Sequence, residues 1–196
     1  MVVVTVGDED AEEAMRRTLA MGADRGVRVW SDALEGADPI TVARALAEVV
    51  RAETPDLVLA GVQSSDAVQA ATGTALAELL GLPRVAVVTK VELGDGKATV
   101  HRELEGGLVD VAEVDTPCVL TIQTGINEPR YATLRAIKQA EQKEIEEREP
   151  SDLGEPAARV RRMFVPAKGE GAEMLDGEPA EIARRIKEIV DERMKT

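Results

Sequence analysis

Strand-like apolar runs alternate with helix-like segments throughout the first 88 residues of the chain. Runs rich in β-branched residues predict short buried strands, because such side chains pack well on a pleated surface. Helical spacing of apolar residues, with aspartate or proline at the starts, predicts helices between them. The expected strands cover 2–6, 27–30, 57–61 and 85–88, and the expected helices about 11–21, 39–53 and 64–80. Parallel strands need crossover helices, so the alternation predicts an α/β fold with a doubly wound, mainly parallel sheet.

The alternation changes after the fourth expected strand, where a β-hairpin is predicted. Two stretches, 90–93 and 98–104, flank a Gly-Asp-Gly turn, and these turn residues favour tight hairpin connections. Further strands are expected at 108–113 and 118–124. The sequence therefore predicts an antiparallel hairpin insertion in the parallel sheet.

The remaining sequence predicts a second, smaller part of the chain. Residues 134–147 are expected to form a polar helix and 149–154 a linker. An amphipathic helix is expected over 178–193, with isoleucines on one face. We therefore divide the chain into a Rossmann-like domain, 1–150, and a C-terminal linker with its helix, 151–196.

The charge of the chain excludes several classes of function. Lys and Arg number 24 and Asp and Glu 37, which gives a formal net charge of −13 at pH 7. Nucleic acids and anionic membrane surfaces attract clustered positive charge, so neither is an expected partner. No apolar run is long enough to span a bilayer and the acidic N-terminus is unlike a signal peptide, so we expect no membrane insertion and a cytoplasmic location. A dispersed acidic surface also suits a halophilic source, where salt screens the repulsion between its charges, and it suits an ordinary acidic cytosolic protein equally well.

Few residues have the chemistry of a catalytic or metal site. His101 is the only histidine and Cys118 the only cysteine. Zinc and similar metals need several such ligands at short spacing, so no metal site is expected. Cys118 falls in an apolar strand, and a buried cysteine behaves as a small hydrophobic residue. Without a nucleophile–base pair, hydrolytic catalysis loses its simplest support, and no catalytic residue is expected.

The segment 56–73, DLVLAGVQSSDAVQAATG, is the best candidate for a ligand site. It places Gly61 at the end of a strand, followed by a polar loop and a helix that begins among small residues. Ligands of open α/β sheets bind at the carboxyl ends of strands, and a helix N-terminus offers N–H groups to a phosphate. Gly7 would lie at the same edge of the sheet. Nucleotide binding is one interpretation of this pattern, and an ordinary turn of small residues is the other.

The segment 125–135, GINEPRYATLR, is the second unusual stretch. It follows a strand and contains the only tyrosine, Tyr131. An exposed Leu134 beside Tyr131 and Arg130 would form a compact contact patch, because tyrosine and arginine are enriched at interface hot spots. Alternatively, these side chains only pack the loop onto the sheet.

Four stretches of the chain resemble the β subunit of electron transfer flavoproteins, a family that includes the FixA proteins. They are TLAMGADRGVRV at 18–29, DLVLAGVQSSD with TG within 56–73, HRELEGGL at 101–108 and NEPRYATL at 127–134. SDLG at 151–154 falls where the family has a similar motif. The resemblance covers most of residues 2–154, and it implies a Rossmann-like fold of the adenine nucleotide alpha hydrolase type.

The resemblance also implies a function. In this family the β subunit pairs with a larger α subunit, and the dimer carries electrons from flavin dehydrogenases, such as the acyl-CoA dehydrogenases of fatty acid oxidation, to a quinone reductase or another acceptor. FAD would be held mainly by the α subunit, and this subunit would bind AMP, or a second FAD if the dimer bifurcates electrons. The nucleotide-binding residues would be Val6, Gly7, Gly61, Gln63, Ser64, Ser65, Asp66, Ala70, Ala71 and Thr72. The loop that docks the dehydrogenase would be Asn127, Glu128, Pro129, Arg130, Tyr131, Ala132, Thr133 and Leu134, with Leu134 as its anchor.

Two features depart from the family pattern. The usual phosphate loop has acidic residues followed by Asn-Gln-Thr, whereas here only Asp66 and Thr72 keep polar side chains of that pattern. Backbone N–H groups could still hold a phosphate. The strand, long loop and helix with which family members begin do not precede Met1 in this sequence, for which a mis-called start or a truncated sequence is the simplest explanation. If the chain does begin there, we expect one strand fewer, an open sheet edge and weaker nucleotide binding.

Two other functions fit part of the sequence. A stand-alone adenine-nucleotide-binding regulator of universal-stress-like fold would share the sheet, but it would need neither the NEPRYATL loop nor the C-terminal extension. An adenylate-forming enzyme would need a glycine-rich SGGxDS loop after the first strand, where this chain has VGDED. The family resemblance favours the electron-transfer subunit.

Overall fold

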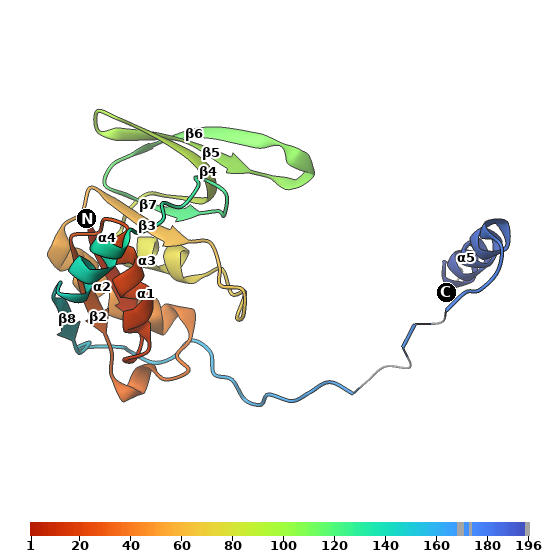
Figure 1. Ribbon diagram of the computed structural model, residues 1–196, viewed down its shortest axis with the longest axis horizontal. Coiled ribbons are helices and arrows are strands. Elements are labelled where there is room, and N and C mark those ends of the chain that lie inside the picture. The colour runs from red at the N-terminus through yellow and green to blue at the C-terminus, as the bar shows by residue number, and fades with distance from the viewer. Residues whose placement is uncertain (168–170, 173, 195–196) are drawn as a thin grey trace. The chain divides into compact units, whose positions relative to one another are not determined.

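The computed structural model describes residues 1–167, 171–172 and 174–194 (Figure 1). The chain divides into two compact units, Met1–Val160 and Arg161–Thr196. The strands of the first unit are β1 (Val2–Val6), β2 (Arg25–Val29), β3 (Leu57–Gly61), β4 (Arg84–Gly94), β5 (Lys97–Glu103), β6 (Val109–Asp115), β7 (Cys118–Ile122) and β8 (Ile145–Arg148). Its α-helices are α1 (Ala11–Ala20), α2 (Pro39–Glu53), α3 (Thr72–Leu80) and α4 (Leu134–Glu141), with short 3-10 turns at Asp32–Leu34 and Glu105–Gly107.

The strands form two sheets that together confirm the predicted α/β class. The first has the order β1-β2-β8 and is entirely parallel. The second has the order β3-β7-β4-β5-β6, in which β3, β7 and β4 are parallel and the β4–β5–β6 hairpins antiparallel. The expected hairpin insertion is therefore present, but the single sheet predicted from the sequence is divided. Within the described residues, β1 pairs only with β2, and β3 only with β7.

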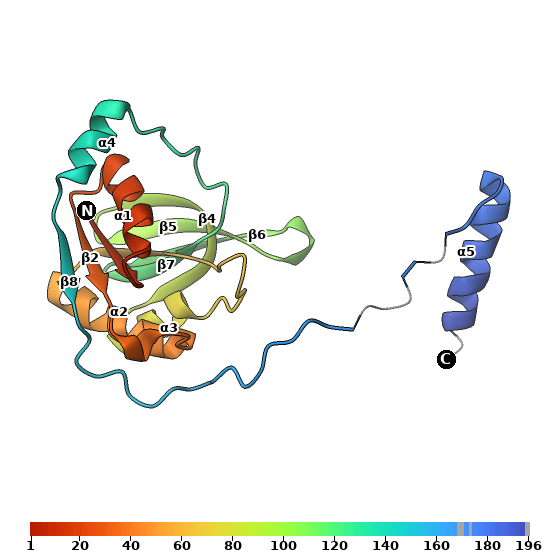
Figure 2. The same cartoon turned by 60° about the horizontal axis from the view of Figure 1, so that its bottom comes forward.

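Helix α2 packs against the first sheet and against α3. Its Ala45 and Val49 pack with Val27 and Val29 of β2 in one cluster, whereas Ala43, Ala47 and Val50 pack with Leu76 of α3 in another. Figure 2 shows α2 beside α3 and α1 beside α4. The predicted start of α2 is confirmed, because Pro39 is its first residue and the Asp38 carboxylate caps it.

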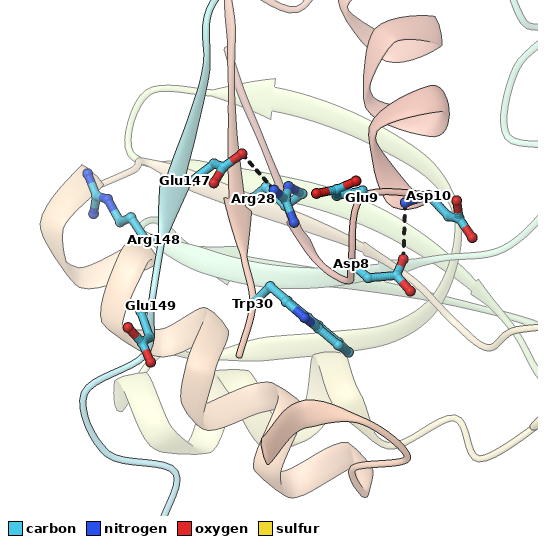
Figure 3. Close-up of a pocket in the computed structure, with 8 residues that line it drawn as sticks. All are labelled: Asp8, Glu9, Asp10, Arg28, Trp30, Glu147, Arg148 and Glu149. Atoms are coloured by element: carbon cyan, nitrogen blue, oxygen red, sulfur yellow. Dashed lines mark hydrogen bonds and ion pairs between the residues drawn. The ribbon is translucent and has the colours of Figure 1, made fainter. Parts of the chain in front are cut away.

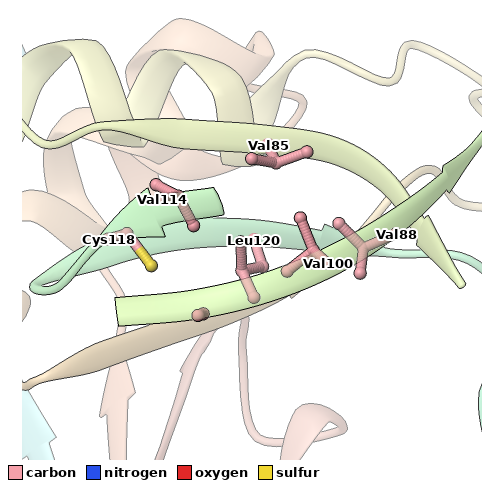
Figure 4. Packing of buried hydrophobic residues seen from close by; sticks show 7 residues of the cluster. Val85, Val88, Val100, Val114, Cys118 and Leu120 are labelled. Carbon is pink, nitrogen blue, oxygen red and sulfur yellow. The ribbon is translucent and has the colours of Figure 1, made fainter. Parts of the chain in front are cut away.

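The largest hydrophobic cluster lies inside the second sheet and its hairpin. Figure 4 shows how side chains of β4, β5, β6 and β7 converge there. They are Val85, Val88, Val100, Val114, Cys118 and Leu120. Strand β4 bends at Val87, whose φ of 60° is left-handed and whose N–H donates to the Thr121 hydroxyl at 3.2 Å. This bend lets a single long strand serve both the parallel sheet and the hairpin.

Two segments differ from the expected secondary structure. The helix predicted to start at Ser64–Asp66 starts only at Thr72, and residues 62–71 form a loop. The helix predicted for 134–147 ends at Glu141, and residues 145–148 are strand β8, which pairs with β2. The polar Ile-Glu-Glu-Arg run favours a helix by composition, but as a strand it forms main-chain hydrogen bonds with β2. This pairing outweighs its helix propensity.

The second unit contains α5 (Pro179–Arg193), close to the predicted bounds of 178–193. None of its residues is buried, and Ile186 and Val190 are each about half exposed. Among the described residues of this unit, none buries the apolar face of α5. No helix in the described ranges is long and apolar enough to cross a membrane.

Candidate nucleotide pocket

A pocket of about 400 Å³ lies where β3 ends and α3 begins. One wall is the loop after β3, formed by residues 61–64, 67 and 69–72, and the other wall is Ala37, Pro39 and Val42 around the first turn of α2. All of these lining side chains are uncharged. The volume falls in the ordinary range for small-molecule sites, and its place at the carboxyl end of a parallel strand is where such folds bind ligands.

The loop wall is held by local hydrogen bonds and by an unusual backbone. The N–H of Ala67 donates to the Asp66 carboxylate at 2.7 Å and lies 3.4 Å from the Ser64 hydroxyl. The Ser64 hydroxyl and this N–H lower the pKa of Asp66, which stays a carboxylate at neutral pH. Val68 and Ala70 have φ of 52° and 48°, a left-handed conformation that β-branched residues rarely adopt. Such strain concentrates at ligand sites.

The first turn of α3 borders the same pocket. Its N-cap residue, Ala71, has no side chain that accepts a hydrogen bond from the helix. The first N–H groups of a helix have no partner within it, and they carry the positive end of the helix dipole. The helix starts close to the sheet because Gly73 has no side chain: a Cβ there would lie 2.7 Å from Thr121 Cγ2 and 3.1 Å from Ala60 Cβ.

The structure distributes the ten expected nucleotide-binding residues over three places. Six of them line the pocket: Gly61, Gln63, Ser64, Ala70, Ala71 and Thr72. Ser65 and Asp66 lie in the same loop but outside the lining, with their side chains exposed. Val6 and Gly7 lie at the end of β1, where the Gly7 N–H donates to the Val29 carbonyl at 3.1 Å. The α2 wall was missed, because nothing local in Ala37-Asp38-Pro39 indicates that a loop more than 20 residues later will face it.

A larger cavity of about 750 Å³ lies at the ends of β1, β2 and β8. Figure 3 shows its lining, with Arg28 pointing toward Glu147. The lining residues are Asp8, Glu9, Asp10, Arg28, Trp30, Glu147, Arg148 and Glu149. Arg28 is buried and is held by Glu147 at 2.6 Å and by Glu12 at 3.7 Å. Five carboxylates against two arginines repel a phosphate, so this cavity is a poorer nucleotide site than the uncharged one.

The loop 127–134, unlike the two pockets, presents its large side chains to solvent. Tyr131 is fully exposed and Leu134 is 81% exposed. Thr133 caps α4 by accepting from the Ala136 N–H at 3.2 Å. Tyr131 and Leu134 therefore do not pack onto the sheet, which was the alternative interpretation of this segment.

The single cysteine and the single histidine both lie within strands of the second sheet. Cys118 is fully buried in the core, and burial raises the pKa of its thiol. His101 lies within β5, paired with Lys90 and Val111 of the neighbouring strands. In the part of the chain that the structure describes, no group of three His, Cys, Asp or Glu side chains is placed to hold a metal ion.

Comparisons with known proteins identify the family. The model of the electron transfer flavoprotein domain matches residues 1–153. The electron transfer flavoprotein subunit beta of Methylophilus methylotrophus is 50% identical over 203 residues, covering 98% of this chain and 76% of that protein. The subunit beta of Syntrophomonas wolfei is 38% identical, covering 100% and 76%. The caffeyl-CoA reductase-Etf complex subunit CarD of Acetobacterium woodii is 36% identical, covering 90% and 71%. The chain therefore belongs to the electron transfer flavoprotein family, as a beta subunit that serves in electron transfer.

Proposed function

We propose that this chain pairs with an α subunit that holds FAD, and that the dimer carries electrons from flavin dehydrogenases to a quinone reductase or another acceptor. In this proposal the chain binds an adenine nucleotide, AMP or the adenylate part of a second FAD, and docks the dehydrogenase. The observation that carries the nucleotide assignment is the uncharged pocket between the end of β3, the start of α3 and the first turn of α2.

The chemistry of the pocket fits an adenylate. The N-terminal N–H groups of α3 could donate to the phosphate, and the helix dipole favours its negative charge. Gly61, Ala70 and Ala71 leave the backbone accessible, so main-chain groups would hold the phosphate at positions where alanine replaces a polar side chain of the family pattern. Pro39 and Val42 offer an apolar surface on the opposite wall that suits a purine ring.

The exposed loop 127–134 supports the docking assignment. A leucine that is 81% exposed beside a fully exposed tyrosine costs solubility unless something covers it. Leucine can enter an apolar pocket of a partner, and tyrosine and arginine around it are typical of interface centres. We assign this loop to the dehydrogenase, with acyl-CoA dehydrogenases as the expected class.

The C-terminal unit supports the assignment of an α subunit. Ile182, Ile186 and Ile189 lie on one face of α5, and an isolated helix of 15 residues is marginally stable in water. We expect this face to pack on the α subunit. A chain produced alone should then aggregate or melt without cooperativity, and a monodisperse monomer with one sharp transition would contradict this part.

The proposal is tested by co-expressing the chain with its α subunit and measuring FAD and AMP released from the purified complex. One FAD with one AMP, or two FAD, per dimer is the expected result. A variant with Ala71→Asp places a carboxylate in the pocket and should lose the adenylate while keeping the α-subunit FAD. Ala52→Asp, at an exposed position of α2 outside the pocket, is the matched control. A complex with FAD and an empty pocket would overturn the nucleotide assignment.

A further inference from the structure

Two charged side chains of α2, Arg44 and Glu48, and its N-cap residue, Asp38, bind the chain that follows β8. We call residues 151–157 the strap. The Glu48 carboxylate accepts from the N–H of Ser151 and of Asp152, both at 3.0 Å, and from the Ser151 hydroxyl at 3.0 Å. Arg44 Nη1 donates to the carbonyls of Leu153 and Glu155 at 2.9 and 2.7 Å. The segment predicted as a linker therefore lies along α2.

Asp38, the residue that caps α2, binds the C-terminal end of the strap. The N–H of Ala157 donates to Asp38 Oδ2 at 3.0 Å. The other oxygen, Oδ1, accepts from the N–H groups of Ile40 and Thr41 at 2.8 and 3.2 Å. Asp38 is buried, with 7% of its surface exposed, so the carboxylate that accepts these hydrogen bonds is largely shielded from water. One carboxylate thus joins the start of a helix to a segment that lies 119 residues further along the chain.

The same turn of α2 is a wall of the nucleotide pocket. Ala37 and Pro39, the two neighbours of Asp38, both line it, and Val42 lines it one turn later. The Asp38 side chain itself is not part of the lining. A shift of Asp38 would therefore move the wall without removing any group that a ligand touches.

We propose that Asp38 is a positioning residue that couples the strap to the nucleotide pocket, so that a bound strap holds the α2 wall in place and a bound nucleotide holds the strap. The proposal rests on the proposed adenylate site, and it adds a means by which the strap regulates the affinity of that site. Coupling between two sites is reciprocal, so each should tighten the other by the same factor. The strap leads directly into the second unit, which gives a route by which a partner bound to that unit could alter nucleotide affinity.

Asp38→Asn separates the two roles of this residue. Asparagine caps helices about as well as aspartate, because its carbonyl oxygen accepts from the same N–H groups. Its amide nitrogen cannot accept from the Ala157 N–H, so the strap loses this anchor while α2 keeps its cap. Glu48→Ala releases the other end of the strap, about 15 Å away along the helix. Glu13→Ala removes an exposed carboxylate on α1 and serves as the control.

The experiment uses the dimer of this chain with its α subunit. It measures AMP affinity by calorimetry and backbone amide exchange of residues 37–42, 62–71 and 151–157, with and without AMP. For both Asp38→Asn and Glu48→Ala we expect faster exchange of the strap and AMP binding about fivefold weaker, the lower end of ordinary coupling. AMP should slow strap exchange in the unaltered protein, and Asp38→Asn should melt within a degree or two of it.

Each outcome decides the proposal. Faster strap exchange with unchanged AMP affinity would overturn the coupling, as would a loss of affinity in the Glu13→Ala control. If the unaltered dimer binds no AMP, the adenylate assignment fails separately. The coupling is then judged without ligand: Glu48→Ala must speed exchange at Ile40 and Thr41, and no change there refutes it. If Asp38→Asn does not fold, Glu48→Ala carries the test, because it lies outside both the cap and the pocket lining.

Discussion

The nucleotide pocket and the loop 127–134 are built in opposite ways. In the pocket, Gly61, Ala70 and Ala71 expose main-chain groups, and the backbone is left-handed at Val68 and Ala70. The loop offers side chains, with Tyr131 and Leu134 exposed to solvent. The first site is defined by backbone position and the second by side-chain chemistry.

This difference decides which substitutions reveal each site. Four of the lining residues are already alanine and one is glycine, so truncation to alanine cannot test those positions. Adding atoms near the backbone should disturb the pocket strongly. The docking loop should behave in the reverse way, because removing an exposed anchor leaves its backbone unchanged.

The largest effect is expected for Gly73→Ala at the start of α3. Its Cβ would meet Thr121 and Ala60 at 2.7 and 3.1 Å, and Thr121 is fixed by its hydrogen bond from Val87. Overpacking of this kind costs about 1–3 kcal/mol. Chemical denaturation should show this loss of stability, together with lost AMP binding.

Gly61→Ala is the matched control, because nothing lies within 4 Å of a Cβ built there. Its stability should stay within about 0.5 kcal/mol, as for a substitution outside a packed core. The added methyl group faces the pocket, so AMP binding should weaken. Equal stability losses in both glycine variants would show that the pocket is not defined by close backbone packing.

Leu134→Ala tests the side-chain site. We expect the rate of electron transfer from the dehydrogenase to fall about tenfold, because losing an interface anchor costs 1–2 kcal/mol or more. FAD content and melting temperature should not change, since the side chain is 81% exposed. Stopped-flow reduction of the dimer measures the effect, and Leu93→Ala, a leucine 67% exposed on the hairpin, should leave the rate unaltered.

Low pH should weaken the contacts of Asp38 and Glu48 with the strap and leave the loop 127–134 unchanged. Burial raises the pKa of Asp38 and Glu48, but the hydrogen bonds that each carboxylate accepts lower it more, so the pKa of each lies below its ordinary value. A carboxyl whose pKa is lowered by folding stabilises the fold above its ordinary pKa, and this stabilisation is lost as pH falls through the lowered value. Amide protection factors of Ser151 and Ala157 should therefore fall below about pH 4.5. A fall that starts near neutral pH would contradict the assignment to these carboxylates.

The smallest effect is expected for Val68→Gly. A left-handed non-glycine residue costs about 1–2 kcal/mol, whereas glycine pays more entropy on folding. The two nearly cancel, so stability should change by less than about 1 kcal/mol. AMP should bind more weakly, because the loop is less ordered before binding. Unchanged affinity would mean that the left-handed backbone has no part in forming the site.

The sequence predicted elements wherever local signals agree. Asp38-Pro39 defines the start of α2, and the Gly-Asp-Gly turn defines the hairpin. Ser64–Asp66 offered three capping residues, yet they belong to a strained loop, because α3 has to start where Gly73 fits against Thr121. Capping propensity alone could not reveal that packing constraint.

Long-range pairing was the part that the sequence could not supply. Strand β8 has a helix-favouring composition, and only its register with β2 makes it a strand. The strap contacts join residues more than 100 positions apart, and no short pattern around Ser151 indicates Glu48 as its partner. The residues of the loop wall were predictable from the strand–loop–helix pattern, whereas the α2 wall depends on tertiary structure.

The late pairing of β8 has a consequence for how the chain is made. Glu147 meets Arg28 across 119 residues of sequence. A ribosome adds about 5–20 residues per second, so β2 waits about 6–24 s for its partner strand to be synthesised. During that interval β1 and β2 form only a two-stranded ribbon, which is marginally stable on its own. The edge of β2 that β8 covers therefore stays unpaired while the segment between the two strands is synthesised, and an unpaired strand edge is a site where other chains can add.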